Sequence, residues 1–175
     1  MFSDPQKIVS QLGLQAGMKV ADFGAGSGFY TLAMGRVLAG SGRVYAIDIR
    51  KYILDKLKNA ASAAHLTNVD VIWGDVEKLG GTKLADASVD FVTCSNILFQ
   101  IDNKENLAAE VNRVLKPKGR ILIVDWRGSY GGVGPEEVKV VSPETARGLF
   151  EKNGFSLDRE IDAGSHHYGF VFKKS

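Results

Sequence analysis

The sequence predicts a single doubly wound α/β domain, in which helices cover both faces of a mostly parallel sheet. Three observations support this fold class. Five short runs of apolar and β-branched residues alternate with segments of helical periodicity. The chain contains 20 glycines, where roughly 12 would be expected at a usual share of about 7%, and they separate these elements. The 175 residues are 45% hydrophobic and 24% charged, a composition typical of one globular domain with its own core.

The five apolar runs have the length and composition of buried strands. They are expected at Met18–Phe23, Arg43–Asp48, Val69–Trp73, Val89–Cys94 and Arg120–Asp125. Because helical segments separate them, consecutive strands should run parallel and be joined by right-handed crossovers.

Helices are expected before, between and after these strands. Residues 1–17 are expected to hold a short N-terminal helix. Apolar residues recur at helical spacing over Ile53–Ala64 and Leu107–Leu115, and each segment leaves a charged face. The second segment is predicted to end in a turn at Lys116–Gly119. A later helix is expected over Ser142–Asn153, with serine as N-cap and proline at the first helical position.

A glycine-rich segment, residues 128–135, follows the fifth predicted strand directly. Ligands of open α/β sheets bind outside the carboxyl ends of the strands. The segment is therefore expected to be either a lid over a site or a flexible surface connection.

The charge balance and the cysteine content exclude several classes of protein. The 22 Lys+Arg and 20 Asp+Glu residues give a net charge of +2, and no basic run offers a footprint for nucleic acid. The single cysteine, Cys94, excludes a disulfide scaffold or a cysteine-rich zinc protein, and no metal site is expected. No stretch reaches the ~18 apolar residues of a membrane span, and the start of the chain is too polar for a signal peptide. A cytoplasmic protein is expected.

The most informative segment is Val20–Thr31, where a strand is expected to run through a glycine turn into a helix. Dinucleotides and S-adenosylmethionine both bind at such turns. Phe29 stands where the dinucleotide pattern has its third glycine, and we expect its side chain to obstruct the close packing of helix on strand. Asp22 would repel a pyrophosphate, whereas a ligand with a sulfonium and an ammonium group favours a nearby carboxylate. The segment therefore favours S-adenosylmethionine over NAD.

Two further acids follow the next two predicted strands. Asp48 ends the second strand, where its carboxylate could accept hydrogen bonds from both hydroxyls of a ribose, as in NAD sites. Asp75 follows the third strand, where it could accept from an adenine amino group. A lone Gly74-Asp75 pair is more often a simple turn, but acids at three successive strand ends favour an adenosine ligand.

With these motifs the chain resembles the class I S-adenosylmethionine-dependent methyltransferases, particularly the small-molecule group that includes ubiquinone and menaquinone C-methyltransferases. The resemblance covers nearly the whole chain. It depends on the segments Val20–Gly28, Ala46–Asp48, Gly74–Asp75, Asp90–Asn96 and Glu110–Arg120. It implies a Rossmann-like sheet of about seven strands, with a sixth strand at Phe155–Ile161 and an antiparallel seventh at Tyr168–Lys173 beside the fifth.

The resemblance also implies which residues bind the cofactor. The glycine loop would hold the methionine part, Asp48 the ribose, and Ile49 would pack on adenine. Asp75 and Val76 would contact the adenine edge, and Ser95 would meet the amino group or the incoming acceptor. The implied set is Asp22, Gly24, Ala25, Gly26, Gly28, Asp48, Ile49, Asp75, Val76 and Ser95.

The acceptor side is less determined by the sequence. The Asn-Pro-Pro-aromatic motif of amino-methylating DNA enzymes is absent, and one cysteine cannot supply the thiols of arsenic methylation. Shared strand-end topology predicts that Asp125, with His166 or His167, forms one side of the acceptor pocket, and that Asn96 and Phe99 form another. The histidines are also consistent with exposed polar residues of a hairpin, and no residue is identified as a catalytic base.

The sequence as a whole favours a methyltransferase that transfers a methyl group by in-line displacement to a small-molecule acceptor. Three alternatives stay open: a catalytically inactive S-adenosylmethionine-binding module or subunit, an NAD-dependent oxidoreductase, and a nucleic-acid methyltransferase. The sequence does not identify the acceptor, its reacting atom or the oligomeric state.

Overall fold

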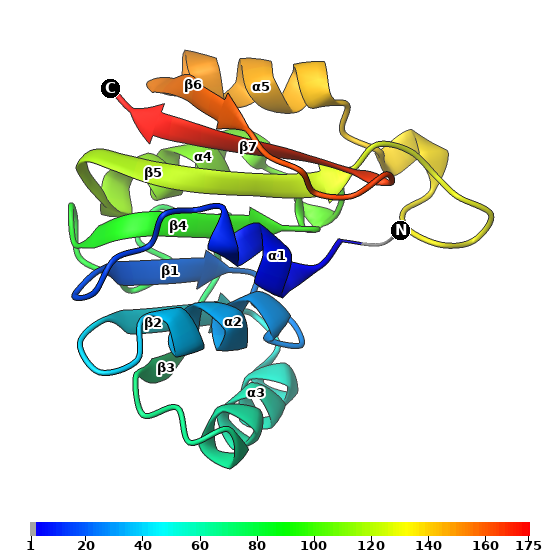
Figure 1. The fold of residues 1–175 in the computed structure, drawn as a ribbon. Helices are drawn as coiled ribbons and strands as arrows, with labels where there is room; N and C mark the ends of the chain where they lie inside the picture. Colours follow the sequence, from blue (N-terminus) through cyan, green and yellow to red (C-terminus); the bar gives the residue numbers. More distant parts are fainter. Residues whose placement is uncertain (1–2) are drawn as a thin grey trace.

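The computed structural model describes residues 3–175, and within them a seven-stranded sheet forms the centre of the molecule (Figure 1). The strands are β1 Lys19–Phe23, β2 Arg43–Asp48, β3 Val69–Trp73, β4 Val89–Ser95, β5 Leu115–Trp126, β6 Phe155–Glu160 and β7 His167–Lys174. Their spatial order is β3-β2-β1-β4-β5-β7-β6. The first five pair in parallel, whereas β7 is antiparallel to both β5 and β6. The predicted Rossmann-like sheet, with an antiparallel strand beside the fifth, is confirmed.

Helices cover both faces of the sheet, as predicted. They are α1 Pro5–Ser10, α2 Phe29–Val37, α3 Lys51–Ala63, α4 Lys104–Val114 and α5 Pro143–Lys152, with short 3-10 turns η1 Leu98–Gln100 and η2 Glu137–Lys139. Figure 1 shows α1 and α2 in front of the sheet and α4 behind it. Buried side chains of α1 and α2 contribute to one hydrophobic core, and those of α4 and α5 contribute to the other. Helix α3 packs against the edge strands β2 and β3.

Local signals explain where several helices begin. The side chain of Asp4 accepts hydrogen bonds from two backbone N–H groups of α1, and that of Asn103 accepts from the N–H of Asn106 in α4. Ser142 caps α5 in the same way, with proline at the first helical position. Helix α1 lies within the segment 1–17, where a short helix is predicted, and ends at Ser10 with Gln11 as its C-cap.

The turn predicted at Lys116–Gly119 is absent, because these residues belong to β5. Helix α4 ends at Val114 and the strand begins at the next residue. The register then shifts from Val89↔Leu115 to Phe91↔Arg120, so the four residues oppose a single residue of β4. Lys118 has a φ of 63° there. Lys118 thus adopts its left-handed conformation in a bulge inside the strand instead of in a separate turn.

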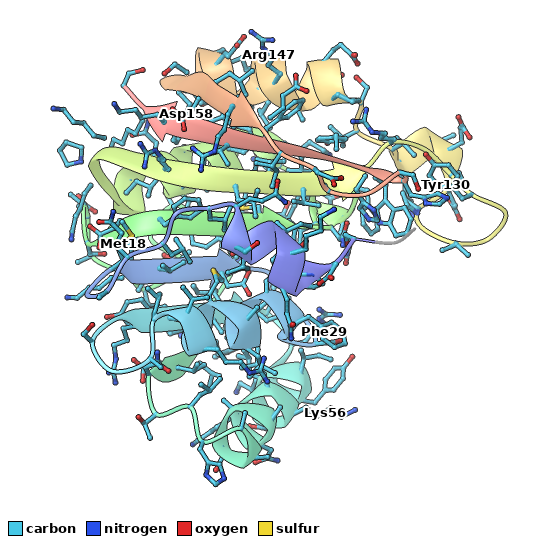
Figure 2. All side chains as sticks on the ribbon, in the orientation of Figure 1. Met18, Phe29, Lys56, Tyr130, Arg147 and Asp158 are labelled. Atoms are coloured by element: carbon cyan, nitrogen blue, oxygen red, sulfur yellow. The ribbon has the colours of Figure 1, made fainter. Side chains whose placement is uncertain are left out.

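The parallel strands end at one edge of the sheet, and this carboxyl edge positions the site. Figure 2 shows Phe29 and Tyr130 at that edge and Met18 at the opposite one. The loops that follow β1, β2, β3 and β4 meet there. Ligands of this fold class bind at such an edge.

Candidate cofactor pocket

A cavity of about 670 Å³ opens at the carboxyl edge of the sheet. The loops after β1, β2, β3 and β4 line most of it, and Ser3 and Pro5 close one side. Nine of the ten cofactor residues implied by the resemblance line this cavity: Gly24, Ala25, Gly26, Gly28, Asp48, Ile49, Asp75, Val76 and Ser95. The remaining one, Asp22, lies beneath it.

The glycine loop adopts a conformation that requires glycine at three positions. Gly24, Gly26 and Gly28 have φ angles of 69°, 53° and 82°, which L side chains rarely adopt. A Cβ on Gly24 would lie 2.7 Å from Ile97 Cγ2, and one on Gly28 would lie 2.8 Å from Leu57 Cγ. A Cβ on Gly26 would meet no atom within 3.7 Å, its nearest neighbour being Gly24 O at 3.8 Å. Arg50 Nη2 would lie 3.9 Å away, so a Cβ at Gly26 would make ordinary contacts, and only the left-handed backbone requires glycine there.

Phe29 does not act as the sequence predicts. Its side chain is 70% exposed and lines the cavity, so it does not obstruct the packing of α2 on the sheet. Tyr30 is the residue of this pair that enters the core, and it also touches the cavity. The prediction that Phe29 excludes a dinucleotide is therefore wrong, because this first helical residue after the turn points outward.

Asp22 lies in β1, two residues before the glycine loop, and binds side chains of α2 and β4. Its carboxylate is 1% exposed and accepts hydrogen bonds from Thr31 Oγ1 at 2.6 Å and Thr93 Oγ1 at 2.7 Å. Burial raises the pKa of Asp22 to about 6, and the hydrogen bonds from both threonines oppose that rise. The carboxylate does not line the cavity, so its charge can act on a bound cation only through space.

Asp48 is placed for a ribose, but its carboxylate has other partners. Oδ1 accepts from the backbone N–H and Nε of Arg50 at 2.9 and 3.0 Å, and Oδ2 accepts from Gly26 N and a terminal Arg50 nitrogen, both at 3.0 Å. Burial would raise the pKa of Asp48, but the hydrogen bonds from Arg50 and Gly26 lower it more. Two of these four contacts come from the half-exposed Arg50 side chain, which ribose hydroxyls would have to displace.

The adenine side of the cavity combines an apolar surface with a polar edge. Ile49 is 60% exposed and lines the cavity beside Val76. Asp75 Oδ1 accepts from the backbone N–H of Glu77 at 3.0 Å, and Oδ2 lies 3.2 Å from Lys78 Nζ. The loop is thus tied in a turn that keeps the Asp75 carboxylate at the cavity wall.

Ser95 and Asn96 line the cavity at the end of β4. Asn96 has a φ of 54°, which is uncommon for a residue other than glycine. Its backbone N–H donates to Val124 O, and its own carbonyl accepts from Gln100 Nε2 at 3.1 Å. Its side-chain Oδ1 is buried without a hydrogen-bond partner among the described residues. A ligand group that donates a hydrogen bond would satisfy this oxygen.

The predicted acceptor wall of Asp125 with a histidine is not formed. The buried Asp125 carboxylate accepts hydrogen bonds from the backbone N–H groups of Leu98 and Trp126, both at 2.8 Å. Burial raises its pKa to about 6, against those hydrogen bonds. Asp125 is absent from the cavity lining, because the carboxylate turns under η1 and holds it.

His166, His167 and Phe99 also lie outside the cavity lining. His167 is 2% exposed, and its ring packs 4.2 Å from the Trp126 ring. Burial lowers its pKa to about 4, helped by nearby His166. His166 packs edge-on against Tyr130, and Phe99 lines a separate, smaller cavity with Pro135 and Glu136. Shared topology brought these side chains to one edge but not into one site.

Sequence reasoning also missed Ser3, Pro5, Ser27 and Ile97, and four further residues of the lining that carry polar groups or follow from η1. These four are Arg50, Glu77, Gln100 and Ile101. Arg50 and Glu77 each follow a predicted ligand-binding acid by two residues, which is the signal that could have found them. Gln100 and Ile101 are positioned by η1, which has no clear sequence signature.

No helix within the described residues 3–175 is long and apolar enough to cross a membrane. No group of three or more His, Cys, Asp or Glu side chains there could hold a metal ion.

Comparisons with known proteins agree with this geometry. A family model described as "Methyltransferase domain" matches residues 21–123. A demethylmenaquinone methyltransferase of Staphylococcus aureus is 29% identical over 120 residues, which cover 69% of this chain and 48% of the relative. The chain thus spans about half the length of the curated relatives it matches.

Solved structures extend the similarity to almost the whole chain. A SAM dependent methyltransferase from Aquifex aeolicus superposes with a TM-score of 0.90 at 27% identity, covering 99% of this chain and 91% of that chain. The [4+2]-cyclase SpnF superposes with a TM-score of 0.82 at 16% identity, over 97% of this chain and 79% of its own. At that identity the likeness to the cyclase shows the fold alone.

The family model, the relatives and the fold agree with the glycine loop and the carboxylates at the strand ends. The matched segment, residues 21–123, is more than half of the chain and carries that loop together with Asp48 and Asp75. The chain belongs to the methyltransferase domain family of class I S-adenosylmethionine-dependent methyltransferases, whose cofactor is S-adenosylmethionine.

Proposed function

We propose that this chain transfers a methyl group from S-adenosylmethionine to a small-molecule acceptor by in-line displacement. One observation carries the proposal: the glycine loop, Asp48 and Asp75 converge on a single cavity of about 670 Å³. That volume is within the ~300–1,000 Å³ of ordinary small-molecule sites. Family membership supports the donor, and the cavity supports an acceptor of modest size.

The cavity residues fit S-adenosylmethionine in shape and in charge. Bound S-adenosylmethionine supplies a methyl group that the sulfonium has already activated. The methionine part would lie along the glycine loop, which lines the cavity and directly follows the strand that carries the buried Asp22 carboxylate. Asp48 would accept from the ribose once Arg50 has moved, and Ile49 with Asp75 would hold the adenine.

The acceptor end of the cavity is mainly apolar. It is lined by Phe29, Tyr30, Asn96, Ile97, Gln100 and Ile101. Apolar walls exclude water from the reacting atoms, and the two amides can orient a polar group by hydrogen bonding. We therefore infer an acceptor that is largely apolar and carries one or two hydrogen-bonding groups. The name of the Staphylococcus aureus relative refers to an acceptor of this kind, demethylmenaquinone.

The residues at the acceptor end provide positioning more than proton transfer. No histidine is among the described residues that line the cavity, and Asp48, Asp75 and Glu77 lie on the loops of the cofactor end. We infer that the reacting atom of the acceptor is nucleophilic without a histidine base beside it.

The buried cysteine, Cys94, also supports the reducing, cytoplasmic setting that we propose for the protein.

Thermal unfolding with S-adenosylmethionine, S-adenosylhomocysteine or NAD tests the cofactor first. A ligand at about 100 times its Kd adds about 2.7 kcal/mol to the free energy of unfolding, which raises Tm by roughly 5–10 °C for a domain of this size. We expect the two adenosyl ligands to stabilise the protein and NAD to leave Tm unchanged. Stabilisation by NAD alone would establish the oxidoreductase alternative.

Transfer of a labelled methyl group tests catalysis separately. The protein is incubated with labelled S-adenosylmethionine and fractionated cell extract, and label is followed into the organic phase. We expect transfer into a fraction of small apolar molecules. Tight binding without transfer into any fraction would favour the inactive binding module instead.

A further inference from the structure

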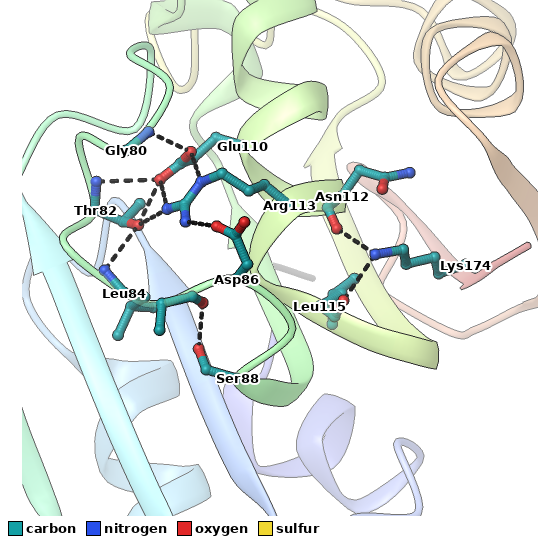
Figure 3. A network of polar contacts seen from close by, with 11 residues as sticks. Gly80, Thr82, Leu84, Asp86, Ser88, Glu110, Asn112, Arg113, Leu115 and Lys174 are labelled. Atoms are coloured by element: carbon teal, nitrogen blue, oxygen red, sulfur yellow. Dashed lines mark hydrogen bonds and ion pairs between the residues drawn. The ribbon is translucent and has the colours of Figure 1, made fainter.

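The loop that joins β3 to β4 carries the adenine side of the cavity, and helix α4 holds it from behind. Gly74, Asp75 and Val76 of this loop line the cavity. Glu110 and Arg113 of α4 do not line it, but their side chains reach the far half of the same loop (Figure 3). Glu110 and Arg113 can therefore affect the cavity only through this loop.

Glu110 binds the loop through both carboxylate oxygens. Its side chain is 0% exposed. Oε2 accepts from Gly80 N at 2.8 Å, and Oε1 accepts from Thr82 N at 3.2 Å and Thr82 Oγ1 at 2.5 Å. These contacts fix the backbone on both sides of Gly81.

Arg113 completes the charge balance of this buried carboxylate. Its Nε and a terminal nitrogen donate to the two Glu110 oxygens at 2.8 and 2.7 Å, and the other terminal nitrogen donates to Asp86 Oδ1 at 2.5 Å. Burial would raise the pKa of Glu110, but the hydrogen bonds from Arg113, Thr82 and Gly80 lower it more. An ionised, fully bonded carboxylate of this kind fixes geometry more firmly than a neutral one.

Gly81 connects the Glu110–Arg113 contacts to the adenine side of the loop. Its carbonyl accepts from the backbone N–H of Asp75 at 3.1 Å. A Cβ on Gly74 would lie 2.5 Å from Gly81 O, and a Cβ on Gly81 would clash with Asp75 O. The two halves of the loop are thus in backbone contact with no spare space, so displacing Gly80–Thr82 displaces Asp75 as well.

We propose that Glu110 and Arg113 are positioning residues for the adenine edge, which they set through Gly80, Gly81 and Thr82. The inference rests on the proposed function, in which Asp75 accepts a hydrogen bond from the adenine amino group. A residue that only stabilised the fold would lower Tm without changing which base the site prefers. A positioning residue changes that preference.

The test compares the affinities of S-adenosylhomocysteine and of its analogue in which hypoxanthine replaces adenine. Calorimetry at 20 °C, well below Tm, gives both Kd values for each variant, and their ratio measures the preference for adenine. We expect Asp75→Asn to reduce this ratio about 10-fold, because the amide replaces one carboxylate oxygen by an NH2 group, which repels the adenine amino group and donates to the O6 of hypoxanthine. We expect Glu110→Gln to reduce it by about 5-fold or more, since the amide cannot accept from all the donors that surround Glu110.

Lys174→Met is the matched control, because this side chain of β7 binds the carboxyl end of the same helix, α4. Lys174 Nζ donates to Asn112 O and Leu115 O at 2.6 and 2.8 Å, away from the loop (Figure 3). We expect this variant to lower Tm and to leave the ratio within 2-fold of the parent. If Asp75→Asn changes the ratio but Glu110→Gln behaves like Lys174→Met, the positioning role is wrong. If Asp75→Asn leaves the ratio unchanged, the adenine assignment of the proposed function is wrong, and the inference fails with it.

A milder pair of variants keeps the test decisive if Glu110→Gln does not fold. Thr82→Val removes only the hydroxyl that donates to Glu110, whereas Thr82→Ser retains it. We expect valine to reduce the ratio about 3-fold and serine to restore the parent value. Equal ratios for the two variants would overturn the proposal.

Discussion

Two buried carboxylates make the stability of this protein depend on pH in an unusual direction. Burial raises the pKa of Asp22 and of Asp125 from 3.8 to about 6, so between pH 4 and 6 the folded state holds protons that the unfolded chain has released. The free energy of unfolding therefore falls as pH rises through this window, by about 1.4 kcal/mol per pH unit for each fully shifted group. The buried His167, whose pKa is lowered to about 4, gives the opposite slope, so it offsets about one of the two carboxylates.

Urea denaturation at pH 4, 5, 6 and 7 measures this dependence. We expect the contribution of Asp22 and Asp125 to the free energy of unfolding to decrease towards pH 6 and then to level off. The Asp125→Asn variant should lose part of that slope, because asparagine does not titrate. An Asp125→Asn variant with the same pH slope as the parent would contradict the raised pKa of Asp125.

Arg50 is expected to compete with the cofactor for Asp48. Its side chain supplies two of the four hydrogen bonds to that carboxylate. Arg50→Ala should therefore increase the affinity for S-adenosylhomocysteine about 3- to 10-fold, the effect of one or two hydrogen bonds no longer displaced. Calorimetry measures the change, with Arg43→Ala as a control whose partner, Asp70, lies outside the cavity lining. A loss of affinity in Arg50→Ala would mean that the guanidinium contacts the ligand.

At the level of elements, the segment 128–135 is an ordered turn that packs on Trp126. Tyr130 and Val133 exchange two backbone hydrogen bonds across Gly131 and Gly132, whose φ angles are 58° and 87°. A Cβ on Gly134 would lie 2.8 Å from the Trp126 ring, whereas one on Gly131 would meet nothing within 4 Å. The segment therefore packs closely against the end of β5.

A pair of glycine variants tests this packing. In a Trp73→Phe background, Trp126 is the remaining tryptophan, so fluorescence reports on its surroundings. Gly134→Ala should shift its emission to longer wavelength, because the loop must lift from the ring. Gly131→Ala should leave the emission unchanged and lower stability by roughly 1 kcal/mol through the left-handed backbone alone. Equal emission shifts in both variants would show that the loop is not held against Trp126.

For the molecule as a whole, strand β7 lies inside the sheet, and each of its two faces packs into one of the two hydrophobic cores. Phe172 packs on Phe150 at 5.4 Å between ring centroids, and Val171 lies in the opposite core. Phe172→Ala should cost about 3–5 kcal/mol, the usual loss for a buried phenylalanine. Leu157→Ala, in the edge strand β6 and only partly buried, should cost clearly less. Urea unfolding compares them, and equal losses would contradict the central role of β7.

Much of this architecture was predictable from the sequence, because strand composition and glycine placement act locally. The strands β2 and β3 occupy the residues predicted for them, and the loops after them bring Asp48 and Asp75 to the cavity. Side-chain partners across the fold were not predictable. Asp125 faces backbone donors of η1, an orientation that depends on a residue 27 positions away and leaves no periodic signal in the chain.

The placement of β7 also affects how the chain can fold during synthesis. Strand β7 is the last of the described strands to be made, yet it separates β5 from β6. Until it emerges from the ribosome, β5 presents an unpaired edge with Ile121, Leu122, Ile123 and Val124, which are all buried in the finished sheet. Such an edge readily pairs with other chains. A nascent chain that stalls before residue 167 would therefore be a substrate for chaperones or a seed for aggregation.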